Sequence, residues 1–144
     1  MHLMRKLVMA KIYYFDANIC IAYMSGKNIE LRDKIDAIPP ECIKIPAIVK
    51  GELLTGAEKS KRQDETFAET FAFCEPYEIV PFEDSILLTY AKIRAALELK
   101  GQKIGANDTI IAATVLAKNG ILVTNNTKEF SRVDGLQLED WTQE

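Results

Sequence analysis

The chain is organised around residues 104–113, which read IGANDTIIAA. One acid, Asp108, stands here at the start of an almost wholly apolar helical stretch. Asn107 is a favourable N-cap, because its side-chain oxygen can accept from the unpaired amides of a first helical turn. The helix dipole favours a carboxylate at this place by about 0.3–1 kcal/mol. The stretch alone is explained equally well by a capped core helix and by a functional acid.

Apolar runs alternate with helical patterns on both sides of this stretch. We expect strands at residues 11–15, 42–45, 77–80, 121–123 and 136–138. We expect helices at residues 19–24, 30–38, 48–59, 63–74, 84–99, 107–119 and 127–130. Pro46 should allow only a turn between the second strand and its helix. Strands that are apolar on both faces and alternate with helices predict an α/β fold with a mainly parallel sheet, flanked by helices.

Length and composition indicate one ordinary globular domain over residues 1–144. Hydrophobic residues make up 48% and charged residues 27% of the chain, and no repeat or linker divides it. We expect residues 1–10 to form a poorly ordered N-terminal extension. The formal net charge of -3 argues against a strongly basic surface, but it is compatible with a nuclease that holds cations in an acidic pocket.

The cysteines and the histidine exclude some kinds of chemistry. Cys20, Cys42 and Cys74 are isolated and show no metal-ligand spacing, which suits buried thiols in a reducing cytoplasm, although the sequence alone leaves a disulfide open. The only histidine, His2, lies at the N-terminus, so we expect no catalysis by a central histidine. Residues 1–9 are too short and too charged for a signal peptide, and no run could span a bilayer. We therefore expect a soluble cytoplasmic protein.

Three acids stand at the edges of apolar elements. Asp16 directly follows the first expected strand, Glu52 lies one turn into the helix after the second, and Asp108 opens the helix that leads into the fourth. Functional groups of parallel sheets collect outside the carboxyl ends of the strands. If the first and fourth strands are neighbours, these acids share one rim with Asn125 and Asn126.

A site with three carboxylates and an amide suits Mg²⁺ or Mn²⁺. Clustered carboxylates repel one another, which raises at least one pKa unless a cation is bound. Such a cation can activate water and stabilise the charge of a phosphoryl transition state, so we expect metal-assisted phosphodiester hydrolysis. Other classes lack their signatures: there is no GxGxxG or GxxxxGK[ST] motif, and Asn18 stands where an aspartyl-phosphate phosphatase needs its second acid.

Five stretches together resemble the PIN-domain family, and within it the VapC-type toxin ribonucleases of type II toxin–antitoxin systems. They are residues 14–21 (YFDANICI), 51–60 (GELLTGAEKS), 104–108 (IGAND), 122–130 (LVTNNTKEF) and 133–141 (VDGLQLEDW). The resemblance runs in order over residues 11–141. It implies a five-stranded parallel sheet, a Mg²⁺- or Mn²⁺-dependent endoribonuclease, a homodimer and a cognate antitoxin that binds it as a heterotetramer or larger assembly.

The resemblance also implies roles for individual residues. Asp16 and Asp108 would be the main metal ligands, and Glu52 would complete their coordination. Asn126 falls where many relatives have a fourth acid, and its amide can position water but supplies no charge. Glu129 is close enough in sequence to compensate, so both are candidate catalytic residues.

Tentative substrate contacts complete the candidate site. Thr124 could cap the turn at Asn125 or contact phosphate, and both residues are candidates for substrate binding. Lys100 and Lys103 flank the loop that enters Asp108, where an RNA backbone would have to pass.

Two functional classes stay open at this point. The first is the metal-dependent endoribonuclease, with tRNA as one possible target. The second is a catalytically weak or inactive PIN module that binds RNA or protein, because Asn126 is neutral.

Overall fold

The computed structural model describes residues 10–143, which form a five-stranded sheet with every neighbouring pair of strands parallel. The strands are β1 (Tyr13–Phe15), β2 (Ile43–Pro46), β3 (Glu78–Val80), β4 (Ile121–Val123) and β5 (Gln137–Glu139). Their order in the sheet is β3-β2-β1-β4-β5. The α/β class and the parallel sheet that the sequence predicts are therefore confirmed.

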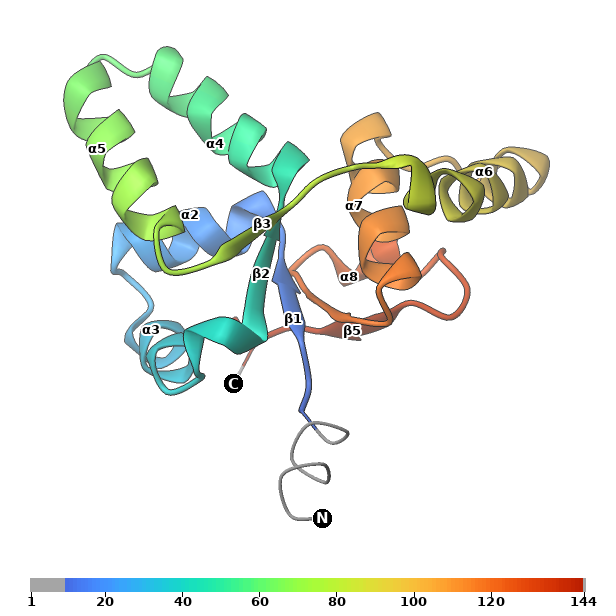
Figure 1. Cartoon of the computed structure of the whole chain (residues 1–144), viewed down its shortest axis with the longest axis horizontal. Helices are drawn as coiled ribbons and strands as arrows, with labels where there is room; N and C mark the ends of the chain where they lie inside the picture. Colours follow the sequence, from blue (N-terminus) through green and yellow to red (C-terminus); the bar gives the residue numbers. More distant parts are fainter. Residues whose placement is uncertain (1–9, 144) are drawn as a thin grey trace.

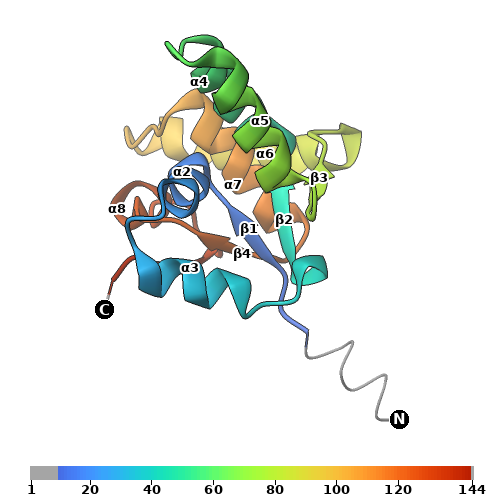
Figure 2. The same ribbon diagram turned by 90° about the vertical axis from the view of Figure 1, so that its left-hand side faces the viewer.

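Helices pack on both sides of this sheet. They are α2 (Ala17–Ser25), α3 (Ile29–Asp36), α4 (Ala47–Glu58), α5 (Gln63–Cys74), α6 (Asp84–Leu99), α7 (Ala106–Ala117) and α8 (Thr127–Phe130), with a 3₁₀ turn, η1, at Pro40–Cys42. Helices α2 and α3 lie on one side of the sheet, and α6 and α7 lie on the other (Figures 1 and 2). Helices α4 and α5 form a pair above the carboxyl ends of the central strands (Figure 1).

The register between β1 and β4 places the site. Phe15 pairs with Val123, and the next amide, that of Asp16, donates to the Val123 carbonyl at 3.3 Å. Both paired side chains are fully buried, as expected for a central strand covered on both faces. The polar residues that follow the two strands, Asp16 and Thr124, therefore emerge side by side at the carboxyl edge.

Helix α7 ends at Ala117, two residues before the expected end, in a left-handed turn. Asn119 adopts a positive φ of 56°, and its amide donates to the Leu116 carbonyl at 3.2 Å. The Gly120 amide donates to the Val115 carbonyl at 3.0 Å. These two bonds form a Schellman motif, which satisfies carbonyls that the helix leaves free and turns the chain directly into β4.

Two local predictions were wrong. Asn107 is not the N-cap of α7, because the helix begins at Ala106 and Gly105 occupies the cap position without a side-chain hydrogen bond. Pro46 does not make a separate turn, because it is the last residue of β2 and also precedes the first residue of α4. Its φ of −57° and ψ of 140° are extended, so proline fits the end of the strand.

The remaining expectations concern cysteines, membranes and the N-terminus. Cys20, Cys42 and Cys74 are all free thiols. None of the helices within residues 10–143 has both the length and the apolarity that crossing a bilayer requires. The expected N-terminal extension, residues 1–10, falls outside the described residues except for Ala10, which is exposed.

Candidate active site

Asp16 is fixed at the end of β1 by two hydrogen bonds to its carboxylate. Its Oδ1 accepts from the Ile19 amide at 3.0 Å, which makes it the N-cap of α2, and its Oδ2 accepts from the Thr124 hydroxyl at 2.5 Å. The side chain is buried. Burial raises the pKa of Asp16 above its ordinary value, although the hydrogen bonds from Thr124 and the backbone pull it down.

Thr124 lies behind Asp16 and has no solvent exposure. Its hydroxyl donates to Asp16 and accepts from the Asn126 amide at 2.9 Å, so it links the ends of β1 and β4. This placement agrees with the turn-capping alternative. A fully buried side chain leaves no surface for the phosphate contact, so we assign Thr124 the positioning of Asp16.

Glu52 reaches the site from α4, on the other side of Asp16. Burial raises its pKa, a hydrogen bond from the Asn107 amide lowers it, and the charge of Asp16 raises it. Its Oε1 atom is buried and has no hydrogen-bond partner among residues 10–143. A buried carboxylate oxygen without a partner is unfavourable unless a proton or a cation is present.

Asp108 lies in the first turn of α7, and its carboxylate and that of Glu129 both lie close to Gly105. Its pKa is raised to about 6, first by burial and then by the charge and hydrogen bond of Glu129, with smaller contributions from the charges of Glu52 and Asp16. The helix dipole acts in the opposite direction but is too weak to restore the ordinary value. The three acids that the sequence singles out therefore lie near enough for their charges to act on one another, and Glu129 joins them.

Glu129 connects the start of α7 to α8. Its Oε1 accepts from the Gly105 amide at 2.7 Å, and its Oε2 accepts from the Asn126 side-chain amide at 2.7 Å. These bonds lower the pKa of Glu129, so it stays ionised beside Asp108. Asn126 thus orients an acid, and Glu129 supplies the charge that Asn126 lacks.

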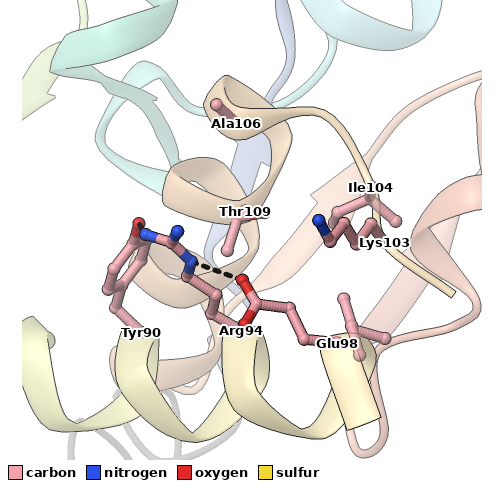
Figure 3. A pocket seen from close by; sticks show the side chains of 8 residues that line it. Tyr90, Arg94, Glu98, Lys103, Ile104, Ala106 and Thr109 are labelled. Carbon is pink, nitrogen blue, oxygen red and sulfur yellow. Dashed lines mark hydrogen bonds and ion pairs between the residues drawn. The ribbon is translucent and has the colours of Figure 1, made fainter. Parts of the chain in front are cut away.

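The tentative substrate residues lie around this centre. Asn125 is exposed in the turn after β4, where it faces solvent beside the acids. Lys103 lines a pocket between α6 and α7, below Ala106 and near the Arg94–Glu98 ion pair of 2.8 Å (Figure 3). Lys100 pairs with Asp134 at 3.5 Å. A role of these residues in binding substrate stays a prediction.

The donor set fits a hard divalent cation. Asp16, Glu52, Asp108 and Glu129 offer only carboxylate oxygens, and the buried Oε1 of Glu52 is a ready ligand. Within residues 10–143, no three His, Cys, Asp or Glu side chains already converge closely enough to enclose an ion. These carboxylates would therefore have to move closer together to enclose an ion, whose charge would offset their mutual repulsion.

The structure brings the two candidates Asn126 and Glu129 into direct contact, at 2.7 Å between the Asn126 side-chain nitrogen and Oε2 of Glu129. The available signal was the spacing in TNNTKEF: Asn126 precedes a short helix, so its side chain faces the residue three positions on. No local pattern in the sequence could predict the contact between Glu129 and Gly105, because 24 residues separate them.

Comparison with known proteins places the chain in a family. The sequence matches the profile of the PIN domain over residues 13–136. The chain therefore belongs to the PIN-domain family.

Its relatives define the branch more narrowly, as that of the VapC proteins. The chain is 39% identical to Ribonuclease VapC2 of Rickettsia felis, over 90% of this chain and 98% of that protein. It is 32% identical to the tRNA(fMet)-specific endonuclease VapC of Shigella flexneri, over 90% and 98% of the two chains.

Solved structures that resemble this chain also contain VapC proteins. VapBC2 from Rickettsia felis, bound to a DNA fragment from its promoter, superposes with a TM-score of 0.85 at 35% identity, over 90% of this chain and 98% of that chain. DNA-bound VapBC from Salmonella typhimurium superposes with a TM-score of 0.86 at 30% identity, over 91% and 98% of the two chains.

Proposed function

We propose that this chain is a Mg²⁺- or Mn²⁺-dependent endoribonuclease and the toxin of a type II toxin–antitoxin pair. The observation that carries the proposal is the cluster of four carboxylates that includes an unpartnered buried oxygen on Glu52 and an Asp108 whose pKa is raised to about 6. Relatives named as ribonucleases and as a tRNA(fMet)-specific endonuclease support RNA as the substrate, with tRNA as the first candidate.

Asp16 and Asp108 would hold the cation, with Glu52 and Glu129 completing the ligand set. When bound, the cation supplies an activated water and charge stabilisation for an in-line attack on the phosphodiester. Thr124 and the Ile19 amide keep Asp16 oriented, and Asn126 keeps Glu129 oriented. No side chain acts as a nucleophile in this scheme.

Cleavage of RNA by variants tests the assignment. The purified chain should cleave RNA in Mg²⁺ or Mn²⁺, and both Asp16→Ala and Asp108→Asn should abolish cleavage. Lys27→Glu, a change in an exposed loop, serves as the control and should cleave like the wild type. Full activity in either acid variant would contradict the site.

An antitoxin partner is proposed because several solved relatives are VapBC complexes. A groove of about 330 Å³ between α2, α4 and α5 fits a protein segment. Ile21, which is 53% exposed, and Met24 line it, and Glu52 lies at its edge. A partner seated there would lie against Glu52, the one candidate site residue that lines the groove. The cytoplasm is where both the partner and RNA would meet this chain.

A homodimer is proposed from a second apolar surface. Leu87 and Leu88 on α6 are 44% and 67% exposed, and Phe82 lies exposed just before that helix. Adjacent exposed apolar residues of this size commonly mark an interface. Sedimentation of the wild type and of Leu88→Glu tests this, and a monomeric wild type would contradict it.

The alternative is a weak or inactive PIN module that binds RNA or protein, and it rests on the neutral Asn126. Glu129 weakens it, because this acid restores the fourth charge. Calorimetric titration decides: no heat of binding at millimolar Mg²⁺ or Mn²⁺ would favour the alternative.

A further inference from the structure

A second groove, the α6 groove, lies on the side of the molecule away from α2 and α3. Its floor is apolar and consists of Ile93 and Leu97 from α6, Leu116 from α7, and Val133 from the turn after α8. The cavity holds about 300 Å³, which is enough for one nucleoside-sized group. None of these floor residues takes part in the proposed active site.

The rim of the α6 groove is basic. Lys92, Lys100 and Arg132 line it, opposed only by Asp134, which Lys100 engages at 3.5 Å. Lys92 is exposed and has no ion-pair partner among residues 10–143. In a chain with a formal net charge of -3, this concentration of positive charge selects an anionic ligand.

Arg132 joins the α6 groove to the active site. It lies three residues after Glu129, and its charge helps to lower the pKa of that carboxylate. Its Nη1 donates to the Lys103 carbonyl at 3.0 Å, within the loop that leads to Asp108. A strand whose phosphate lies at the acids would therefore reach the basic rim within a few nucleotides.

We propose that the α6 groove binds the single-stranded RNA that flanks the scissile phosphate. A base would rest on the apolar floor while Lys92, Lys100 and Arg132 contact backbone phosphates, a combination typical of single-strand binding. The inference rests on the proposed ribonuclease function for its substrate class, and it adds a site at which that substrate is held away from the acids.

Binding of a fluorescently labelled single-stranded RNA of mixed sequence, measured by anisotropy in chelator, tests the groove without cleavage. Lys92→Glu removes the net positive charge of the rim, and Ala96→Trp fills the groove without changing its charge. Each should weaken binding about tenfold, and only Lys92→Glu should also flatten the salt dependence, by about 0.7–1 in the log–log slope. Lys27→Glu makes the same charge change in the loop between α2 and α3 and should bind like the wild type.

Cleavage kinetics in Mn²⁺ provide the second readout. The two groove variants should raise KM and leave kcat near that of the wild type, because the acids are untouched. Unchanged RNA affinity in both variants would overturn the groove proposal, as would an equal loss in Lys27→Glu. If both variants bind RNA normally but lose affinity for a polyglutamate peptide, the groove takes an acidic protein segment and the RNA proposal is likewise overturned. A wild type that binds RNA through the groove but never cleaves it refutes the ribonuclease proposal alone.

Discussion

Asp108 shows how a helix start serves an active site. The first turn of α7 offers a favourable dipole, yet burial and three neighbouring carboxylates raise the pKa of Asp108 to about 6. The ionised carboxylates around Asp108 therefore repel one another, and a bound cation would relieve this repulsion. Helix stability alone therefore does not explain an acid at this position.

Asp108→Asn should therefore stabilise the metal-free protein. In chelator above pH 6, we expect the free energy of unfolding to rise by about 1 kcal/mol, after allowing for the partial exposure of the side chain. A raised folded-state pKa means that the folded protein binds more protons than the unfolded one between about pH 4 and 6. Ionisation of Asp108 therefore does not destabilise the wild type below pH 4. The destabilisation grows as the pH rises and is complete above about pH 6.

Urea denaturation of the wild type and of Asp108→Asn across this pH range measures the difference. The control is Asp33→Asn, which makes the same change at an exposed acid on α3, outside the site. If Asp108→Asn is less stable than the wild type at pH 7.5, repulsion between the carboxylates does not destabilise the metal-free protein.

Thr124 is predicted to position Asp16. Thr124→Val removes the hydroxyl and leaves a buried carboxylate with one donor fewer, so we expect a loss of about 1–3 kcal/mol in stability. Cation affinity and kcat should fall about 10–100-fold, as for other residues that orient a metal ligand. Thr124→Ser keeps the donor and should restore most of the affinity for Mn²⁺, which calorimetry measures. A Ser variant as weak as the Val variant would mean that packing, and not the hydrogen bond, matters here.

At the scale of elements, most of the fold could be predicted from the sequence. Strands and helices follow from local apolar patterns, and α5, α6, β4 and α8 have the predicted bounds. Asn107 was misjudged because α7 begins one residue earlier, at Ala106, and the hydrogen bond from its amide to Glu52 is one that no local rule reveals. The contact between Glu129 and Gly105 could not be predicted either, since it exists only once α7 and α8 are placed.

Glu129 is predicted to act both as a charge and as a tether between α8 and α7. Glu129→Gln keeps an acceptor for the Gly105 amide but removes the charge, whereas Glu129→Ala removes both. We expect both variants to lose cleavage, because each weakens cation binding. Only Glu129→Ala should speed hydrogen exchange of the amides at residues 105–108, which NMR measures. Equal rates of hydrogen exchange at these amides in the two variants would contradict the tethering role.

At the scale of the whole molecule, the order of the strands assembles the site. Asp16 and Glu52 follow the adjacent strands β1 and β2, and Asp108 and Glu129 flank β4 on the other side of β1. Adjacency of β1 and β4 was a condition of the sequence argument, and the pairing of Phe15 with Val123 confirms it. Which carboxylate oxygens are buried depends on packing and was beyond sequence reasoning.

The groove between α2, α4 and α5 is predicted to bind the antitoxin. Ile21→Asp places a charge on an exposed groove residue, so we expect at least tenfold weaker binding of the purified antitoxin and little change in RNA cleavage. Ile29→Asp makes the same change on an exposed residue of α3 outside the groove and serves as the control. Calorimetry measures both, and equal effects would exclude the groove as the binding site.

The central claim is that the acids at the carboxyl edge of the sheet form a cation site, and titration of Mn²⁺ into the metal-free protein tests it most directly. The wild type should bind Mn²⁺ at or below millimolar concentration, and Asp16→Ala and Asp108→Asn should each lose that binding while remaining folded by circular dichroism. Absence of binding in the wild type, or undiminished binding in both variants, would contradict the claim.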